Sequence, residues 1–216
     1  MEIKLMDINN PNTELLMQVR TGHRLLAAFY QRLYSNLDKL ASELELSFYV
    51  WRPANFDRPA TLSINPFQKW QWDLLPAMAS YFIFKTDFDN NKIVPGHCLV
   101  EIKVDLDTAV DGKSDLGGQP DALGIKTSIE ESTSILSVRA YSPYQEIAGN
   151  WYYDLWSKCS NIPLSSEPSE LDNFPVITSG FEIDIQDLLE TDGLDNLIGR
   201  AKSIMESTCS ASENRL

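Results

Sequence analysis

Glu101 and Lys103 are the two residues whose types and spacing come closest to a catalytic pair. They stand two apart in an alternating stretch that predicts a strand, so both side chains lie on the same face. Asp87, at the end of the preceding predicted strand, supplies a second carboxylate. Two carboxylates can hold a divalent metal ion while a lysine lies beside the attacking water. The three residues therefore form a candidate site for metal-assisted hydrolysis.

The order of these residues resembles the Asp…Glu-x-Lys arrangement of the PD-(D/E)XK nuclease superfamily, over the 17 residues from Asp87 to Lys103. The resemblance implies a metal-dependent nuclease or phosphodiesterase. The proline-aspartate step of that family is absent here, because Lys85 and Thr86 precede the acidic position. Alternating charges also occur on any strand face that is exposed to solvent. We favour this interpretation, in which the protein has no catalytic residue, no bound metal and no cofactor.

The expected hairpin argues against a shared metal site. Residues 79–88 and 97–107 predict two antiparallel strands joined by the turn residues 89–92. Counting from this turn places Asp87 opposite His97. Since His97 is four residues from Glu101 along its strand, Asp87 and Glu101 would be separated by about 13 Å. We therefore expect Glu101 to pair with Lys85 or Lys103 in solvent.

An acidic stretch from Asp107 has the composition of a calcium-binding loop. However, Ala109 and Gly118 fall where oxygen ligands are required. We interpret the stretch as an acidic turn within the glycine-rich loop 108–126.

The negative charge of the chain lies in its second half. Residues 1–104 carry 11 Lys/Arg and 11 Asp/Glu, whereas residues 105–216 carry 7 Lys/Arg and 20 Asp/Glu. Such a field repels nucleic acid and anionic membranes and attracts a basic protein partner. We therefore expect a non-enzymatic, acidic protein-binding module that masks a basic partner, as an immunity protein, an antitoxin or a nucleic-acid mimic does.

Aromatic residues supply candidate anchors for that partner. The residues that we expect in the binding surface are tryptophans from two clusters and aspartates of the glycine-rich loop: Trp70, Trp72, Trp151, Trp156, Asp111, Asp115 and Asp121. Burial in the core is the alternative explanation for the aromatic residues. The acidic surface would first attract the basic partner electrostatically, and the aromatic anchors would then dock against it.

The order of predicted elements indicates an α+β fold. We expect a helix at residues 13–45, a sheet-rich region at 46–185 and a helix at 185–206, followed by a disordered tail at 207–216. About five strands, antiparallel or mixed, would pack against the long N-terminal helix and the C-terminal helix in one domain, residues 1–206.

The predicted N-terminal helix carries a heptad seam over residues 16–44. A homodimer through this seam is possible, although we favour an internal core stripe. The three cysteines are widely spaced, and no apolar stretch is long enough to be a signal peptide or a membrane span. We therefore expect a soluble cytoplasmic protein.

Overall fold

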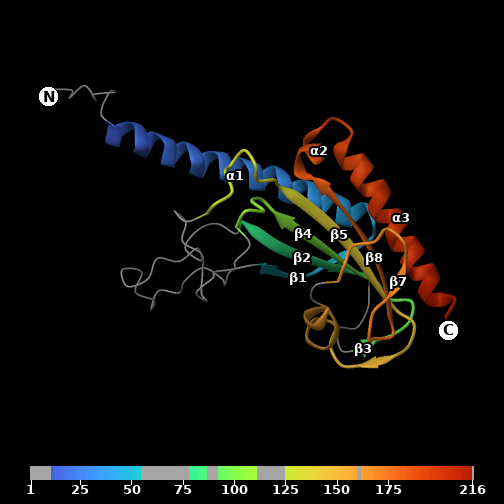
Figure 1. Ribbon diagram of the computed structural model, residues 1–216. Helices are drawn as coiled ribbons and strands as arrows, with labels where there is room; N and C mark the ends of the chain where they lie inside the picture. Colours follow the sequence, from blue (N-terminus) through green and yellow to red (C-terminus); the bar gives the residue numbers. More distant parts are fainter. Residues whose placement is uncertain (1–10, 55–77, 87–91, 111–124, 160–161, 216) are drawn as a thin grey trace. The chain divides into compact units, whose positions relative to one another are not determined.

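The computed structural model describes residues 11–54, 78–86, 92–110, 125–159 and 162–215 (Figure 1). The chain forms two compact units, residues 1–40 and residues 41–216. The second unit contains the whole sheet. The single domain expected for residues 1–206 stays a prediction.

The first unit consists mainly of α1, which spans Pro11–Glu43 and continues three residues into the second unit. The helix expected at residues 13–45 is therefore present. It ends where Glu45 takes a positive φ of 54°. Large apolar side chains near its N-terminal end are exposed, namely Leu15, Leu16, Met17, Val19, Leu25 and Leu26. The homodimer through residues 16–44 stays a prediction.

The second unit is built on an antiparallel sheet of six strands, in the order β1-β2-β4-β5-β8-β7 (Figure 1). Their bounds are Ser47–Pro53 (β1), Ala79–Lys85 (β2), Leu99–Asp105 (β4), Ile135–Pro143 (β5), Ser169–Glu170 (β7) and Val176–Asp184 (β8). Lys92–Ile93 (β3) and Ile147–Ala148 (β6) form a separate pair. The α+β class is confirmed, with one strand more in the main sheet than the five expected.

Alternation along the strands gives the sheet two different faces. One face carries apolar rows that cross neighbouring strands in register, such as Phe82, Ile102, Val138 and Phe181. The other face carries polar rows, such as Tyr81, Lys103, Ser137 and Glu182. We call these the covered face and the open face.

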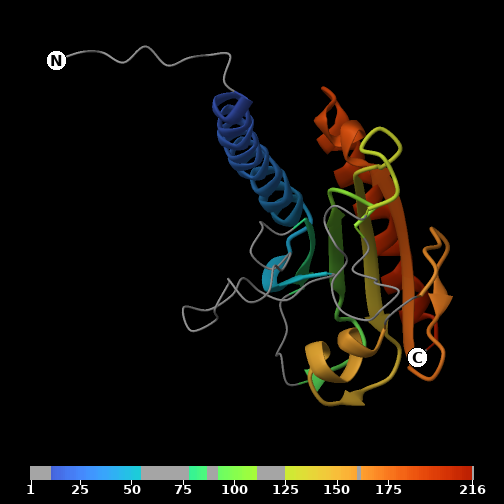
Figure 2. The same cartoon turned by 60° about the vertical axis from the view of Figure 1, so that its left-hand side comes forward.

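Two helices follow β8, and the longer one packs on the covered face. Asp184 caps α2 (Ile185–Leu189) by accepting a 2.7 Å hydrogen bond from the amide of Gln186. The α3 helix (Gly193–Glu213) then runs along β5 and β8 (Figure 2). Residues 207–213, expected in a disordered tail, belong to this helix, because Thr208 and Ser212 are buried against the sheet.

A separate apolar cluster lies at one end of the open face. It includes Leu99, Tyr141 and the short helical segments η2 (Trp151–Leu155) and η3 (Trp156–Lys158). Trp151 is fully buried and donates through Nε1 to the carbonyl of Lys92. This cluster fixes the position of Trp156, which faces the polar rows of the sheet. None of the described helices is long and apolar enough to cross a bilayer.

Candidate ligand-binding cavity

A cavity of about 1020 Å³ lies over the open face of the sheet. Residues of five strands, β1, β2, β4, β5 and β8, line it together with described residues of the stretches 156–159 and 162–166. The described residues that line it include Arg52, Tyr81, Glu101, Lys103, Asp105, Thr108, Ser137, Arg139, Trp156, Cys159, Ile162, Leu164, Ser166, Gly180, Glu182 and Arg200. We call this the sheet cavity.

Two cross-strand rows form the centre of the floor. In the first row Glu101 of β4 lies opposite Arg139 of β5, which lies opposite Gly180 of β8. In the second row, two residues along, Lys103 lies between Tyr81 and Ser137. The antiparallel register therefore brings charges of both signs next to one another on a single face.

Glu101 is enclosed at the base of the cavity. Trp156 Nε1 and the Tyr141 hydroxyl both donate to its Oε2, the latter at 3.3 Å. Burial raises the pKa of the Glu101 carboxyl, while the Trp156 hydrogen bond and the nearby Arg139 oppose the rise. The expected solvent-exposed pairing of Glu101 is wrong, because an indole and a phenol enclose it. Among described residues, none donates to Oε1.

Lys103 is committed to a different carboxylate. Its Nζ lies 3.0 Å from Asp105 Oδ2, two residues along the same strand face. Asp105 is 9% exposed, and its Oδ1 has no hydrogen-bond partner among the described residues. A buried acceptor without a donor is costly, so this oxygen is available to a donor that enters the cavity.

Trp156 forms an aromatic and cationic wall with residues of β1 and β2. Its ring lies edge-to-face with Tyr81, at a centroid distance of 5.3 Å. The Arg52 guanidinium lies 5.6 Å from the Trp156 ring centroid, within the range of a cation–π contact. The indole thereby links Arg52 at the wall to Glu101 at the base.

Residues 162–166 form a rim that is fastened to the floor. Arg139 Nη2 donates to the carbonyl of Ile162 at 2.6 Å, and the Gly180 amide donates to the carbonyl of Ser165 at 2.6 Å. A Cβ at Gly180 would lie 2.7 Å from Leu164 Cδ2 and 2.7 Å from the Val138 carbonyl oxygen. A side chain here would therefore collide with the backbone of β5 as well as with Leu164 of the rim, so the position requires glycine.

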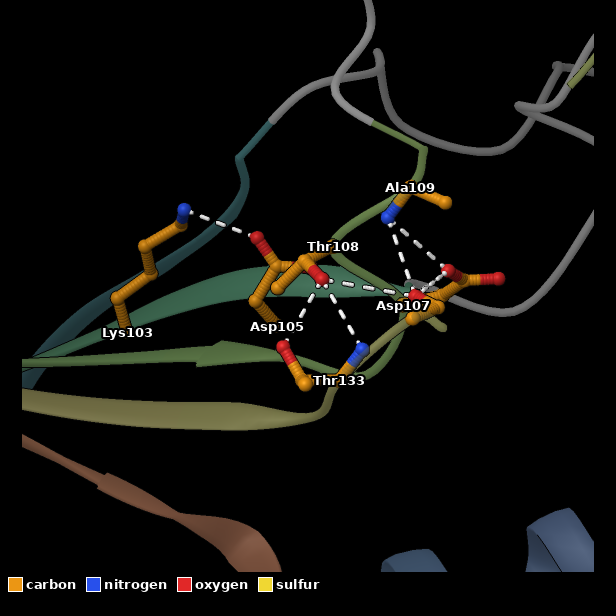
Figure 3. A network of polar contacts seen from close by, with 7 residues as sticks. Lys103, Asp105, Asp107, Thr108, Ala109 and Thr133 are labelled. Carbon is orange, nitrogen blue, oxygen red and sulfur yellow. Dashed lines mark hydrogen bonds and ion pairs between the residues drawn. The ribbon is translucent and has the colours of Figure 1, made fainter. Parts of the chain in front are cut away.

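A hydrogen-bonded turn closes the end of β4 near Thr108 (Figure 3). Asp107 Oδ1 accepts from the Ala109 amide at 3.1 Å and from the hydroxyl of Ser132. Thr108 Oγ1 accepts from the Thr133 amide at 3.1 Å. This network ties the turn after β4 to the residues before β5, and Asp107 acts in it as a turn acceptor.

The structure brings together only part of the predicted sites. Trp151 and Trp156 are buried, so neither is an exposed anchor, although Trp156 lines the cavity. The other predicted residues lie outside the described residues: Trp70, Trp72, Asp87, Asp111, Asp115 and Asp121. Ile83 is the residue of β2 that faces Glu101. Among described residues, no group of three or more His, Cys, Asp or Glu could hold a metal ion.

Sequence reasoning missed Arg52, Tyr81, Arg139 and Tyr141. One signal was available for Arg139, which interrupts the otherwise apolar or small stretch of β5, residues 135–142. A charged residue in the centre of a buried strand requires a partner, which points to a polar site on that face. The contact of Arg52 with Trp156 joins residues 104 apart and has no local signal.

A protein-family model with the description PM0109 matches residues 9–211. No match was found among curated proteins or among solved structures. The matched range includes every residue that lines the sheet cavity.

Proposed function

The chain belongs to the PM0109 family, and from the geometry of the sheet cavity we propose that it binds a small anionic ligand there. One observation carries the proposal. Arg52, Lys103 and Arg139, from three different strands, line the same cavity in a chain whose formal net charge is −13. A local concentration of basic groups on an acidic protein favours a ligand of opposite charge.

The charges of the cavity do not simply cancel. Its lining contains four basic residues and three acidic ones: Lys103 is paired with Asp105, and the guanidinium of Arg200 on α3 lies 4.0 Å from the ring centroid of Phe181, a covered-face residue. Arg52 forms no ion pair with any described residue, and its guanidinium lies against the Trp156 ring. Arg139 is held by the carbonyl of Ile162. Arg52 also donates through Nε to the carbonyl of Pro53, and Arg139 is 9% exposed, so a carboxylate or phosphate group would bind the guanidinium nitrogens that these hydrogen bonds leave over.

The size of the cavity sets the scale of the ligand. About 1020 Å³ is at the upper end of the range for small-molecule sites. Tyr81 and Trp156 supply apolar surface beside the arginines. Asp105 Oδ1, as a free acceptor, favours a ligand that also carries a hydrogen-bond donor.

Titration of the full chain with three anionic probes tests this proposal. Inorganic phosphate, citrate and AMP are added separately, and binding is followed by calorimetry and NMR. We expect saturable binding of at least one probe. Arg52→Gln should weaken it by about tenfold or more, because a hydrogen bond to a charged group contributes about 1.5–3 kcal/mol. Lys202→Gln, an exposed basic position outside the cavity lining, is the matched control and should change nothing.

The proposal is contradicted if none of the three probes binds saturably to the folded chain. It is equally contradicted if Arg52→Gln and Lys202→Gln reduce binding to the same extent, because the effect would then reflect only the net charge of the protein.

The acidic mask is a second proposal, and a different observation favours it. Six exposed carboxylates are concentrated in 14 residues, from the end of β8 through α2 to the start of α3: Glu182, Asp184, Asp187, Glu190, Asp192 and Asp195. A concentrated field of this kind can steer a basic protein partner. If so, replacing Asp187, Glu190 and Asp192 with Asn or Gln should slow association with the partner, and the difference should vanish at about 0.5 M salt.

A further inference from the structure

The C-terminal half of α3 lies unusually close to the sheet. Ser179 Oγ on β8 is 3.3 Å from the carbonyl oxygen of Ile204 and 2.5 Å from Thr208 Oγ1. One turn further along, the Ser212 hydroxyl donates to the carbonyl of Pro143 at 2.5 Å. Only small side chains permit such contacts, so helix and sheet backbones approach closely here.

Two cysteines belong to this close interface. Cys98, the residue immediately before β4, is fully buried, and Cys209 on α3 is partly exposed. Hydrogen bonds of neighbouring residues bring the two cysteines towards each other: the Ser142 hydroxyl on β5 donates to the carbonyl of His97 at 3.2 Å, and Ser212, one turn from Cys209, donates to the carbonyl of Pro143. The two thiols affect each other's ionisation. Both cysteines are free in this structure. A disulfide requires Cα atoms within about 7 Å of one another, which a close helix–sheet contact allows.

The two thiols differ in their readiness to react. Interaction with the Cys98 thiol lowers the pKa of Cys209, because it stabilises the thiolate of that residue. The same interaction, together with burial, raises the pKa of Cys98. The more acidic thiol is also the one that solvent can reach.

We propose that Cys98 and Cys209 form a reversible disulfide when the protein meets a peroxide. The Cys209 thiolate attacks one peroxide oxygen, the O–O bond breaks and a sulfenic acid forms, with the leaving oxygen taking up a proton as water. The Cys98 sulfur then attacks the Cys209 sulfur, the S–O bond breaks and a second water leaves. Overall, two thiols lose two hydrogens and two electrons, and one hydrogen peroxide becomes two waters.

Such a bond would join α3 covalently to the first residue before β4. The interface is already held by the hydroxyl contacts of Ser179 and Ser212, so the disulfide forms within the existing packing. Cys159 is the natural comparison within the same chain. It is partly buried, and burial raises its pKa to about 11, so it should not compete.

Peroxide treatment of the reduced full-length chain tests the inference. Remaining thiols are alkylated with iodoacetamide, and the peptides are mapped by mass spectrometry without reduction. We expect one cross-linked pair, Cys98 with Cys209, in both the wild type and Cys159→Ser. Dithiothreitol should reverse it. In Cys98→Ser, dimedone should trap the sulfenic acid on Cys209, because the resolving thiol is gone.

Two results would overturn the inference. One is that folded wild-type protein loses its Cys209 thiol to peroxide without any cross-link to Cys98. The other is that the Cys98–Cys209 pair forms no faster in the folded chain than in urea, where native proximity is lost. Circular dichroism of each variant before oxidation establishes that it is folded.

Discussion

The covered and open faces of the same sheet are built for different tasks. The covered face buries Ile102, Val138 and Phe181, where apolar surface is removed from water, and α3 packs on its strands β5 and β8. The open face, one residue away along each strand, holds Glu101 and Arg139 in the floor of a cavity. Alternation along the strands therefore separates stability from binding, so adjacent residues should respond very differently to substitution.

The largest difference is expected between Ile102 and Lys103. Ile102→Ala should destabilise the fold by about 2–4 kcal/mol, because it leaves a cavity in the apolar packing of the covered face. Lys103→Ala, on the open face, should cost less, about 1–2 kcal/mol, because the lysine is partly exposed but its loss leaves the buried Asp105 carboxylate without a donor. Urea unfolding of both variants measures the two values. Equal losses would mean that the two faces contribute equally to stability.

The next effect concerns the rim of the cavity. Gly180→Ala should cost about 1–3 kcal/mol, since its Cβ would collide with Leu164 and with the Val138 carbonyl. Gly199→Ala is the matched control, because nothing lies within 4 Å of its Cβ position in α3. That variant should be neutral, or more stable by up to about 1 kcal/mol. If both variants behave alike in urea unfolding, Leu164 and the Val138 carbonyl do not confine Gly180 as the structure indicates.

A smaller effect, visible only as a change with pH, is expected at Glu101. Its pKa in the folded protein is raised above the ordinary value of 4.5, so the folded state binds this proton more tightly than the unfolded state. The free energy of unfolding of the wild type, minus that of Glu101→Gln, should therefore fall as pH rises from 4.5 through the raised pKa. Urea unfolding of the two proteins at a series of pH values measures this difference. A difference that grows over the same interval would show that the enclosed carboxylate is stabilised as the anion.

The fold could be predicted from the sequence wherever the signal was local. Alternation over residues 99–105 correctly placed Glu101 and Lys103 on one face and Ile102 on the other. Helix capping by Asp184 was also visible, but the length of α3 was not. Thr208 and Ser212 are polar, and only their contacts with β8 and the carbonyl of Pro143 explain why the helix continues to Glu213.

The candidate site was harder to predict because its contacts are remote in sequence. Glu101 was expected in solvent, since nothing near it in the chain encloses it. Trp156, 55 residues away, and Tyr141, 40 residues away, donate to its carboxylate only after the sheet and η3 have formed. Position on a strand face was therefore predictable, whereas burial on that face depended on tertiary packing.

Two indole groups offer the most direct test of the sheet cavity as a binding site. Trp156 Nε1–H donates to Glu101 at the base of the cavity, whereas Trp151 Nε1–H donates to the Lys92 carbonyl within the apolar cluster. Their NMR signals can be assigned with Trp156→Phe and Trp151→Phe and followed during titration with phosphate, citrate and AMP. We predict that a binding probe shifts the Trp156 signal saturably and leaves the Trp151 signal in place. Saturable binding that moves neither signal, or moves both equally, would contradict the account.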